Sequence, residues 1–217
     1  MNGIHDLGGM DGFTLPERDQ DFPLREEWER EVWGMFFALN GVPGAGGGRN
    51  YIERLPPALY LRLPYFAKWL YARETALIES GVVSPEELAN PDGPVSPYPV
   101  PADFRPLTPA QVVANVQRDS STLLGVDVPA RFAAGDSVLA RNEHPEWHTR
   151  SPRYVRGHRG TIVKLHGPHR LLDKPPADAG PQHLYTVAFS ARELWGARGH
   201  ENDTIHVELW ELHLEEA

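Results

Sequence analysis

Cysteine is absent from the 217-residue sequence. The chain by itself therefore cannot form disulfides, thiolate metal sites or a cysteine nucleophile. Basic residues are fewer than acidic ones: the sequence has 21 Lys and Arg and 30 Asp and Glu, which gives a formal net charge of −9. No stretch has the length and apolar character of a membrane span or a signal peptide, so we expect no membrane partner and a cytoplasmic location.

The N-terminal half has the apolar spacing of helices. Large apolar side chains recur every three to four residues in two long segments. The segment that precedes them, residues 1–23, is rich in Gly, Asp and Pro and shows no periodic apolar pattern. The pattern predicts an extended arm over 1–23, helices over 24–40, 49–55 and 64–80, and a capped helical turn at 84–88.

The C-terminal half changes to the alternation of strands after a proline-rich segment. Seven of the 19 residues from 91 to 109 are proline, which is typical of an extended linker. A short helix capped by Thr108 follows, and then strands are predicted over 135–141, 160–167, 183–190 and 203–214, with a capped helical turn at 190–196. The sequence thus predicts an α+β fold: arm 1–23, helical domain 24–90, linker 91–109, and an SH3-like small β-barrel with one short helix over 110–217.

Ten histidines raise the question of a metal site. His144 and His148 have the four-residue spacing that places two imidazoles on one helix face, but Pro145 between them disfavours a helix. His166 and His169 have no third ligand at a recognisable spacing either. We therefore expect no metal bound by this chain alone.

One basic segment stands out in this acidic chain. HTRSPRYVRGHRGTIV, residues 148–163, holds four arginines and two histidines without a carboxylate, which indicates an anionic ligand or partner. One alternative is a barrel that binds nucleic acid, or a non-catalytic interaction protein. Residues 110–217 hold 12 basic and 14 acidic side chains, which disfavours nucleic acid as the partner.

Six blocks of sequence together resemble the β subunit of nitrile hydratase. In order along nearly the whole chain they are MNGIHDLGGMDGF, EEWEREVWGMFFAL, RNYIERLPPALYLRLPYFAKWL, HTRSPRYVRGHRGTIV, HLYTVAFSARELWG and VELWELHLEE. The resemblance implies a lyase that hydrates nitriles to amides as an αβ heterodimer, usually paired into an α2β2 heterotetramer. Because the chain has no cysteine and no convincing histidine spacing for a metal, we expect the isolated chain to be inactive.

The resemblance places the cofactor on the α subunit. In this family a non-corrin Co(III) or non-haem Fe(III) ion is held by three α cysteines, two of which are oxidised to sulfenic and sulfinic forms. Trp69 in PYFAKW resembles the cobalt type more closely. Lewis-acid polarisation of the nitrile, attack by metal-activated water and attack by the sulfenate oxygen all remain open as mechanisms.

Two arginines carry the catalytic role that the resemblance implies. Arg49 in RNYIE and Arg150 in RSPRY match the family's arginines that hydrogen-bond the oxidised cysteines. A guanidinium fork suits such compact anions because it donates several hydrogen bonds in fixed geometry. Most of the other arginines of the basic segment, which are Arg153, Arg156 and Arg159, are expected to serve the subunit interface or the surface.

The resemblance also implies a substrate pocket lined by aromatic side chains, which correspond to Phe36, Tyr65 and Trp69. Each of these also lies on the apolar stripe of a predicted helix and can equally belong to the core. Two departures from the family pattern, GVPGAGGG before the first arginine and Phe66-Ala67, leave the shape of the pocket and the preferred nitrile open.

Overall fold

The computed structural model describes Asp6 and residues 24–39, 42, 48–99, 102–118, 121–173 and 180–217. Contacts group the chain into two compact units: a helical unit, Thr14–Asp119, and a sheet unit, which combines Met1–Phe13 with Ser120–Ala217. The predicted arm lies outside the described residues except for Asp6, as does most of GVPGAGGG. None of the helices in the described part is long and apolar enough to cross a membrane.

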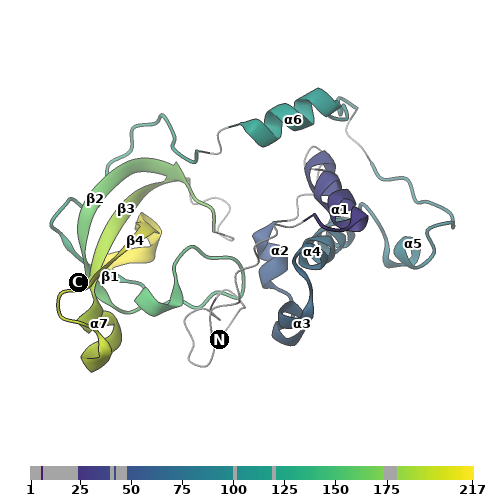
Figure 1. Ribbon diagram of the computed structural model, residues 1–217. Helices are drawn as coiled ribbons and strands as arrows, with labels where there is room; N and C mark the ends of the chain where they lie inside the picture. Colours follow the sequence, from purple (N-terminus) through teal and green to yellow (C-terminus); the bar gives the residue numbers. More distant parts are fainter. Residues whose placement is uncertain are drawn as a thin grey trace. The chain divides into compact units, whose positions relative to one another are not determined.

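The helical unit is built around one long helix, α4 (Figure 1). Its helices are α1 (Glu27–Ala38), α2 (Arg49–Glu53), α3 (Pro57–Arg62), α4 (Tyr65–Glu79), α5 (Pro85–Ala89) and α6 (Pro109–Gln117). Helices α1 and α2 both pack against α4, and α6 contacts α1. Its contacts group α6 with the other helices of this unit.

Local signals account for several of the helix ends. Ser84 and Thr108 accept a hydrogen bond from the backbone three residues later, as the predicted capping boxes require. Gly81, with a φ of +71°, follows α4 in the left-handed conformation that ends helices. Helix α3 was not predicted, because Pro56-Pro57 suggested a helix end; Pro57 instead occupies the first helical position, where proline needs no hydrogen-bond partner.

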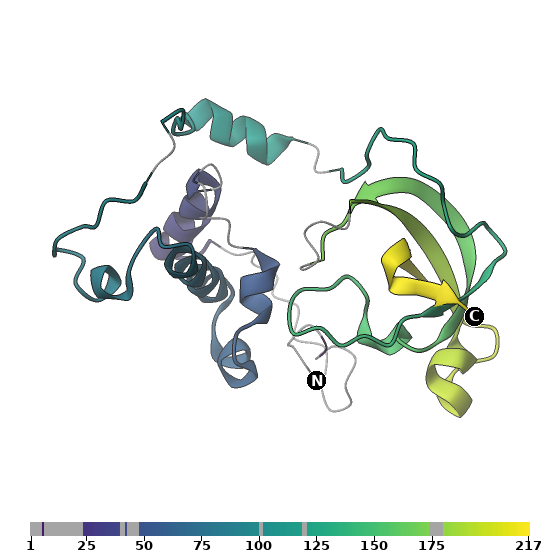
Figure 2. The same ribbon diagram turned by 180° about the vertical axis from the view of Figure 1, so that it is seen from behind.

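The sheet unit holds a five-stranded antiparallel sheet (Figure 2). Its strands are β1 (Ser137–Ala140), β2 (Arg159–Arg170), β3 (Pro181–Ser190), β4 (Thr204–Trp210) and β5 (Leu214–Glu216), in the order β4-β3-β2-β1-β5. A helical turn, α7 (Ala191–Trp195), is capped by Ser190 as predicted. Fully buried apolar side chains from several strands form the core, among them Val138, Ile162, Val187, Phe189 and Leu209.

The prediction of a single strand over 203–214 was wrong, because a 3-10 turn at Glu211–His213 divides this segment into β4 and β5. The Glu211 carboxylate turns inward and accepts hydrogen bonds from the Tyr185 hydroxyl at 2.6 Å and from the Arg131 backbone at 3.0 Å. The turn carries β5 to the far edge of the sheet, where it pairs with β1.

The predicted α+β class is confirmed. Closure of the sheet into an SH3-like barrel stays a prediction, because β4 and β5 are the two edge strands and no pairing joins them in the described residues. The division into arm, helical domain, linker and barrel domain stays a prediction; residues 91–99 and 102–108 carry neither helix nor strand.

Gly160 in β2 offers a test of how tightly this sheet is packed. A Cβ at this position would lie 2.6 Å from Cγ1 of Val187 and 3.0 Å from the Ala188 carbonyl oxygen. We expect Gly160→Ala to lower the free energy of unfolding by about 1–3 kcal/mol, as overpacked cores do. Gly125→Ala, where a Cβ meets nothing within 4 Å, is the control. Equal urea midpoints for the two variants would contradict this packing.

Candidate functional site

A cavity of about 290 Å³ lies within the helical unit. It is lined by two cations, three aromatic rings and one aliphatic side chain: Arg49, Ile52, Tyr60, Tyr65, Lys68 and Trp69. Tyr65 and Trp69 lie one turn apart on α4, with ring centroids 5.6 Å apart. The structure thus brings together one predicted catalytic arginine and two of the three predicted substrate-binding aromatics.

Arg49 is held in place by a buried carboxylate. It is the first residue of α2, and Glu53 is the last, so the two side chains share one helix face. One terminal nitrogen of the guanidinium lies 2.8 Å from a carboxylate oxygen of Glu53. The Glu53 side chain is 5% exposed, whereas that of Arg49 is 58% exposed. The arginine is therefore anchored at one end while much of the guanidinium group remains accessible.

The third predicted aromatic, Phe36, lies behind the cavity and is not among its lining residues. Its ring centroid is 4.5 Å from that of Trp69. On α4, Arg73 places its guanidinium 4.5 Å from the Phe36 ring and donates a 2.9 Å hydrogen bond to the Phe36 carbonyl. Burial lowers the pKa of Arg73, which is 1% exposed. Phe36 thus supports the Trp69 ring in the described structure.

Lys68 gives the cavity a second cation. Its ammonium nitrogen lies 3.8 Å from the centroid of the Tyr60 ring, which is the geometry of a cation–π contact. Burial lowers the pKa of Lys68. The sequence pattern pointed to neither residue. Tyr60 lies on the unpredicted helix α3, and Lys68 lies on the predicted helix α4 without any local signal of a role.

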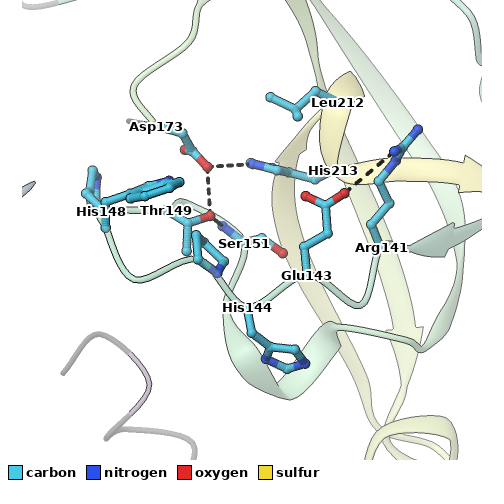
Figure 3. Close-up of a pocket in the computed structure, with 11 residues that line it drawn as sticks. Arg141, Glu143, His144, His148, Thr149, Ser151, Asp173, Leu212 and His213 are labelled. Atoms are coloured by element: carbon cyan, nitrogen blue, oxygen red, sulfur yellow. Dashed lines mark hydrogen bonds and ion pairs between the residues drawn. The ribbon is translucent and has the colours of Figure 1, made fainter. Parts of the chain in front are cut away.

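The second predicted arginine, Arg150, lies in the sheet unit on the connection between β1 and β2. Its side chain is exposed, while its backbone N–H donates a 2.9 Å hydrogen bond to Asp173. The Thr149 hydroxyl donates to the other oxygen of Asp173 at 2.7 Å. Figure 3 shows the Thr149 and Asp173 side chains at a cavity of about 370 Å³, which is also lined by His148 and His213.

Asp173 is a largely buried carboxylate that is surrounded by hydrogen-bond donors. Its side chain is 9% exposed, and His213 Nε2 lies 2.8 Å from its Oδ2. Burial alone raises the pKa of this carboxyl group, but the hydrogen bonds from His213, Thr149 and the Arg150 backbone outweigh it, so the pKa lies below its ordinary value. Asp173 therefore stays ionised at neutral pH.

The basic segment does not form one uniform cationic surface. Arg156 is an exception to the expectation for most of these arginines, because its side chain is 1% exposed and lies 3.0 Å from the Asp6 carboxylate. The Asp6 carboxylate accounts for the burial of Arg156, because a buried guanidinium group needs an anion beside it. The side chain of Arg159 is exposed, as expected. The burial of Arg156 weakens the nucleic-acid alternative.

Among the described residues, no group of three or more His, Cys, Asp or Glu side chains could hold a metal ion. His148 is buried and His144 is exposed. Local sequence signals could have identified Glu53, which has helical spacing from Arg49. None marked Asp173 or His213, which lie 23 and 63 positions beyond Arg150.

Two family models match the chain. The model described as "Nitrile hydratase beta subunit, N-terminal" matches residues 1–115, and the one described as "Nitrile hydratase beta subunit, C-terminal" matches residues 121–216.

Curated relatives match over almost the entire chain. The cobalt-containing nitrile hydratase subunit beta of Pseudonocardia thermophila is 35% identical over 228 residues, which cover 99% of this chain and 96% of that protein. The low-molecular weight cobalt-containing nitrile hydratase subunit beta of Rhodococcus rhodochrous is 35% identical over 223 residues, which cover 99% of both. The nitrile hydratase subunit beta of Pseudomonas putida is 37% identical over 229 residues and 100% of both.

The lowered pKa of Asp173 predicts a pH-dependent contribution to stability. A carboxyl group whose pKa is lower in the folded chain than in the unfolded chain stabilises the folded state at pH values above its unfolded pKa, near 3.8. This stabilisation is lost as the pH falls through the pKa of the folded state. We expect the difference in unfolding free energy between the wild type and Asp173→Asn to shrink on acidification from about pH 6 to below about pH 4. Urea titrations across this range measure it. A difference that stays constant with pH would contradict the prediction.

Proposed function

Since the chain belongs to the family of nitrile hydratase β subunits, we propose that it hydrates nitriles to amides together with an α subunit that carries the metal centre. One observation carries the proposal: each compact unit presents an accessible arginine that is tied to a largely buried carboxylate. Arg49 is tied to Glu53 through its guanidinium, and Arg150 to Asp173 through its backbone.

In the proposal, the two guanidinium groups donate hydrogen bonds to the oxygens of oxidised cysteines in the α subunit. Sulfenate and sulfinate groups are compact anions with outward oxygens. Charge-assisted hydrogen bonds to such oxygens contribute about 1.5–3 kcal/mol each, and more of this is retained where water is excluded. The exposure of Arg49 and Arg150 in the single chain suits them to this role, because their donors are available to a partner.

The nitrile would bind beside Tyr65 and Trp69 in the cavity of the helical unit. These rings lie in the same cavity as Arg49, so a substrate that contacts them is close to the proposed catalytic arginine. Phe36 would fix the Trp69 ring from behind. Lys68 adds an ammonium group to the same wall, which favours nitriles that carry a hydrogen-bond acceptor.

We propose cobalt as the metal held by the α subunit. Two of the relatives are named as cobalt-containing, and Trp69 lies in the cobalt-type sequence PYFAKW. A metal ion bound there would supply Lewis-acid polarisation. The residues of this chain would position the sulfur ligands that hold the metal in the α subunit, bind the substrate and exclude water. An iron centre is the alternative to cobalt, and an α2β2 assembly and a cytoplasmic location stay predictions.

Substitution of the two arginines by lysine tests the catalytic assignment. Lysine keeps the charge but lacks the forked donors. We expect Arg49→Lys and Arg150→Lys each to lower the turnover of a small nitrile by about tenfold or more, which corresponds to about 1.4 kcal/mol. The rate is measured on the αβ complex and normalised to its metal content.

Arg170→Lys is the matched control, because its side chain is exposed and its backbone N–H is also hydrogen-bonded, to the Thr122 carbonyl. We expect its rate to stay within about twofold of the wild type. Turnover near the wild-type rate for both Arg49→Lys and Arg150→Lys would show that the assignment is wrong.

The location of the metal is tested by elemental analysis. We expect the separately produced chain to contain no stoichiometric transition metal and to lack activity, because it has no cysteine. The complex produced with the α subunit should contain stoichiometric cobalt. Stoichiometric cobalt, iron or zinc in the single chain would contradict this part of the proposal.

A further inference from the structure

The backbone around Arg150 is held from one side by a chain of hydrogen bonds that ends at Asp173. The Asp173 carboxylate accepts from the Arg150 N–H at 2.9 Å and from the Thr149 hydroxyl at 2.7 Å. The same hydroxyl accepts from the Ser151 N–H at 3.1 Å. Two consecutive backbone N–H groups are therefore fixed, directly or through Thr149, by one largely buried carboxylate. Figure 3 shows the Asp173, Thr149 and Ser151 members of this chain.

The other side of the same backbone is held by Arg156. Its Nε and one terminal nitrogen donate to the Ser151 carbonyl at 3.1 and 2.8 Å. Arg156 is in turn oriented by Asp6, and both side chains are 1% exposed. Hydrogen bonds between buried charged groups are stronger and better oriented than those exposed to water. The peptide groups on the C-terminal side of Arg150 thus have little freedom.

His213 completes the arrangement without acting as an acid or base. Its Nδ1 accepts the backbone N–H of Trp210 at 3.3 Å, which assigns the ring proton to Nε2, the nitrogen 2.8 Å from Asp173. Both ring nitrogens are therefore engaged within the chain. A catalytic His-Asp pair would need one nitrogen directed at a substrate.

We propose that Asp173 is a positioning residue of the reaction, which acts by fixing the backbone from which Arg150 reaches the oxidised cysteines of the α subunit. This inference rests on the proposed function of Arg150. Arg156 supports the same backbone from the opposite side. Neither Asp173 nor Arg156 contacts the metal centre or the substrate in this account, and their effect passes through Arg150 alone.

The first test compares Asp173→Asn with a matched control in the αβ complex. Glu193→Gln is the control, because Glu193 also accepts the backbone N–H of an arginine, Arg159, at 2.9 Å and also pairs with a histidine, His158, at 3.2 Å. We expect Asp173→Asn to lower the turnover number by about tenfold at unchanged cobalt content, and Glu193→Gln to stay within about twofold. Equal rates for Asp173→Asn and the wild type would overturn the proposal.

A double-mutant cycle separates positioning of Arg150 from a general structural role. If Asp173 acts only through Arg150, Asp173→Asn should cause less than about a twofold further loss when Arg150→Lys is already present. A further loss of the full size seen in the wild-type background would overturn the proposal. Wild-type turnover of Arg150→Lys alone would instead refute the proposed role of Arg150, and the positioning role with it.

Thr149→Val provides a second variant if Asp173→Asn fails to assemble with the α subunit. It removes the hydroxyl that links Asp173 to the Ser151 N–H and leaves the carboxylate in place. We expect a severalfold lower turnover, with the same lack of a further effect beside Arg150→Lys. Hydrogen exchange on the full chain should be faster at the backbone amides of Arg150 and Ser151 in this variant. Unchanged exchange and turnover would count against the proposal.

Discussion

The contacts of two largely buried carboxylates with accessible arginines, one an ion pair and the other a backbone hydrogen bond, are the interactions on which this chain's proposed role depends. Glu53 binds the guanidinium of Arg49, and Asp173 binds the backbone of Arg150. Burying a carboxylate is unfavourable unless donors surround it, so each anion requires the geometry of its partners to be maintained. The lowered pKa of Asp173 indicates that its donors outweigh its desolvation.

The two arginines are fixed in different ways, which has consequences for how they can act. Arg49 is held through its side chain, so one end of the guanidinium is already committed to Glu53. Arg150 is held through its backbone, while its side chain is exposed. An arginine side chain that becomes fixed loses up to about 2 kcal/mol of rotamer entropy. Because the Arg150 backbone is already fixed, only the side chain has to be ordered when the partner binds. The buried pair of Arg156 and Asp6 stabilises that backbone.

Much of the fold follows from local sequence signals, whereas the supporting contacts of the site do not. Helical periodicity and capping boxes predicted α1, α4, α5 and α6, and alternation predicted β1 to β3. Helix α3 was not predicted, because a pair of prolines is typical of a helix end as well as of a helix start. The division of the last strand was not predicted either, because the inward turn of Glu211 depends on Tyr185 from β3. The resemblance pointed to Arg49 and Arg150, but the partner of Arg150 is 23 positions away, and only the folded sheet unit brings the two together.

The central claim is that both arginines bind the oxidised cysteines of the α subunit. A crystal structure of the αβ complex tests it most directly, through the distances from the guanidinium nitrogens of Arg49 and Arg150 to the sulfur-bound oxygens. The account predicts distances of about 2.7–2.9 Å for both residues, as in other charge-assisted hydrogen bonds. Guanidinium groups that are turned away from the metal centre, and paired instead with carboxylates on the α surface, would contradict it.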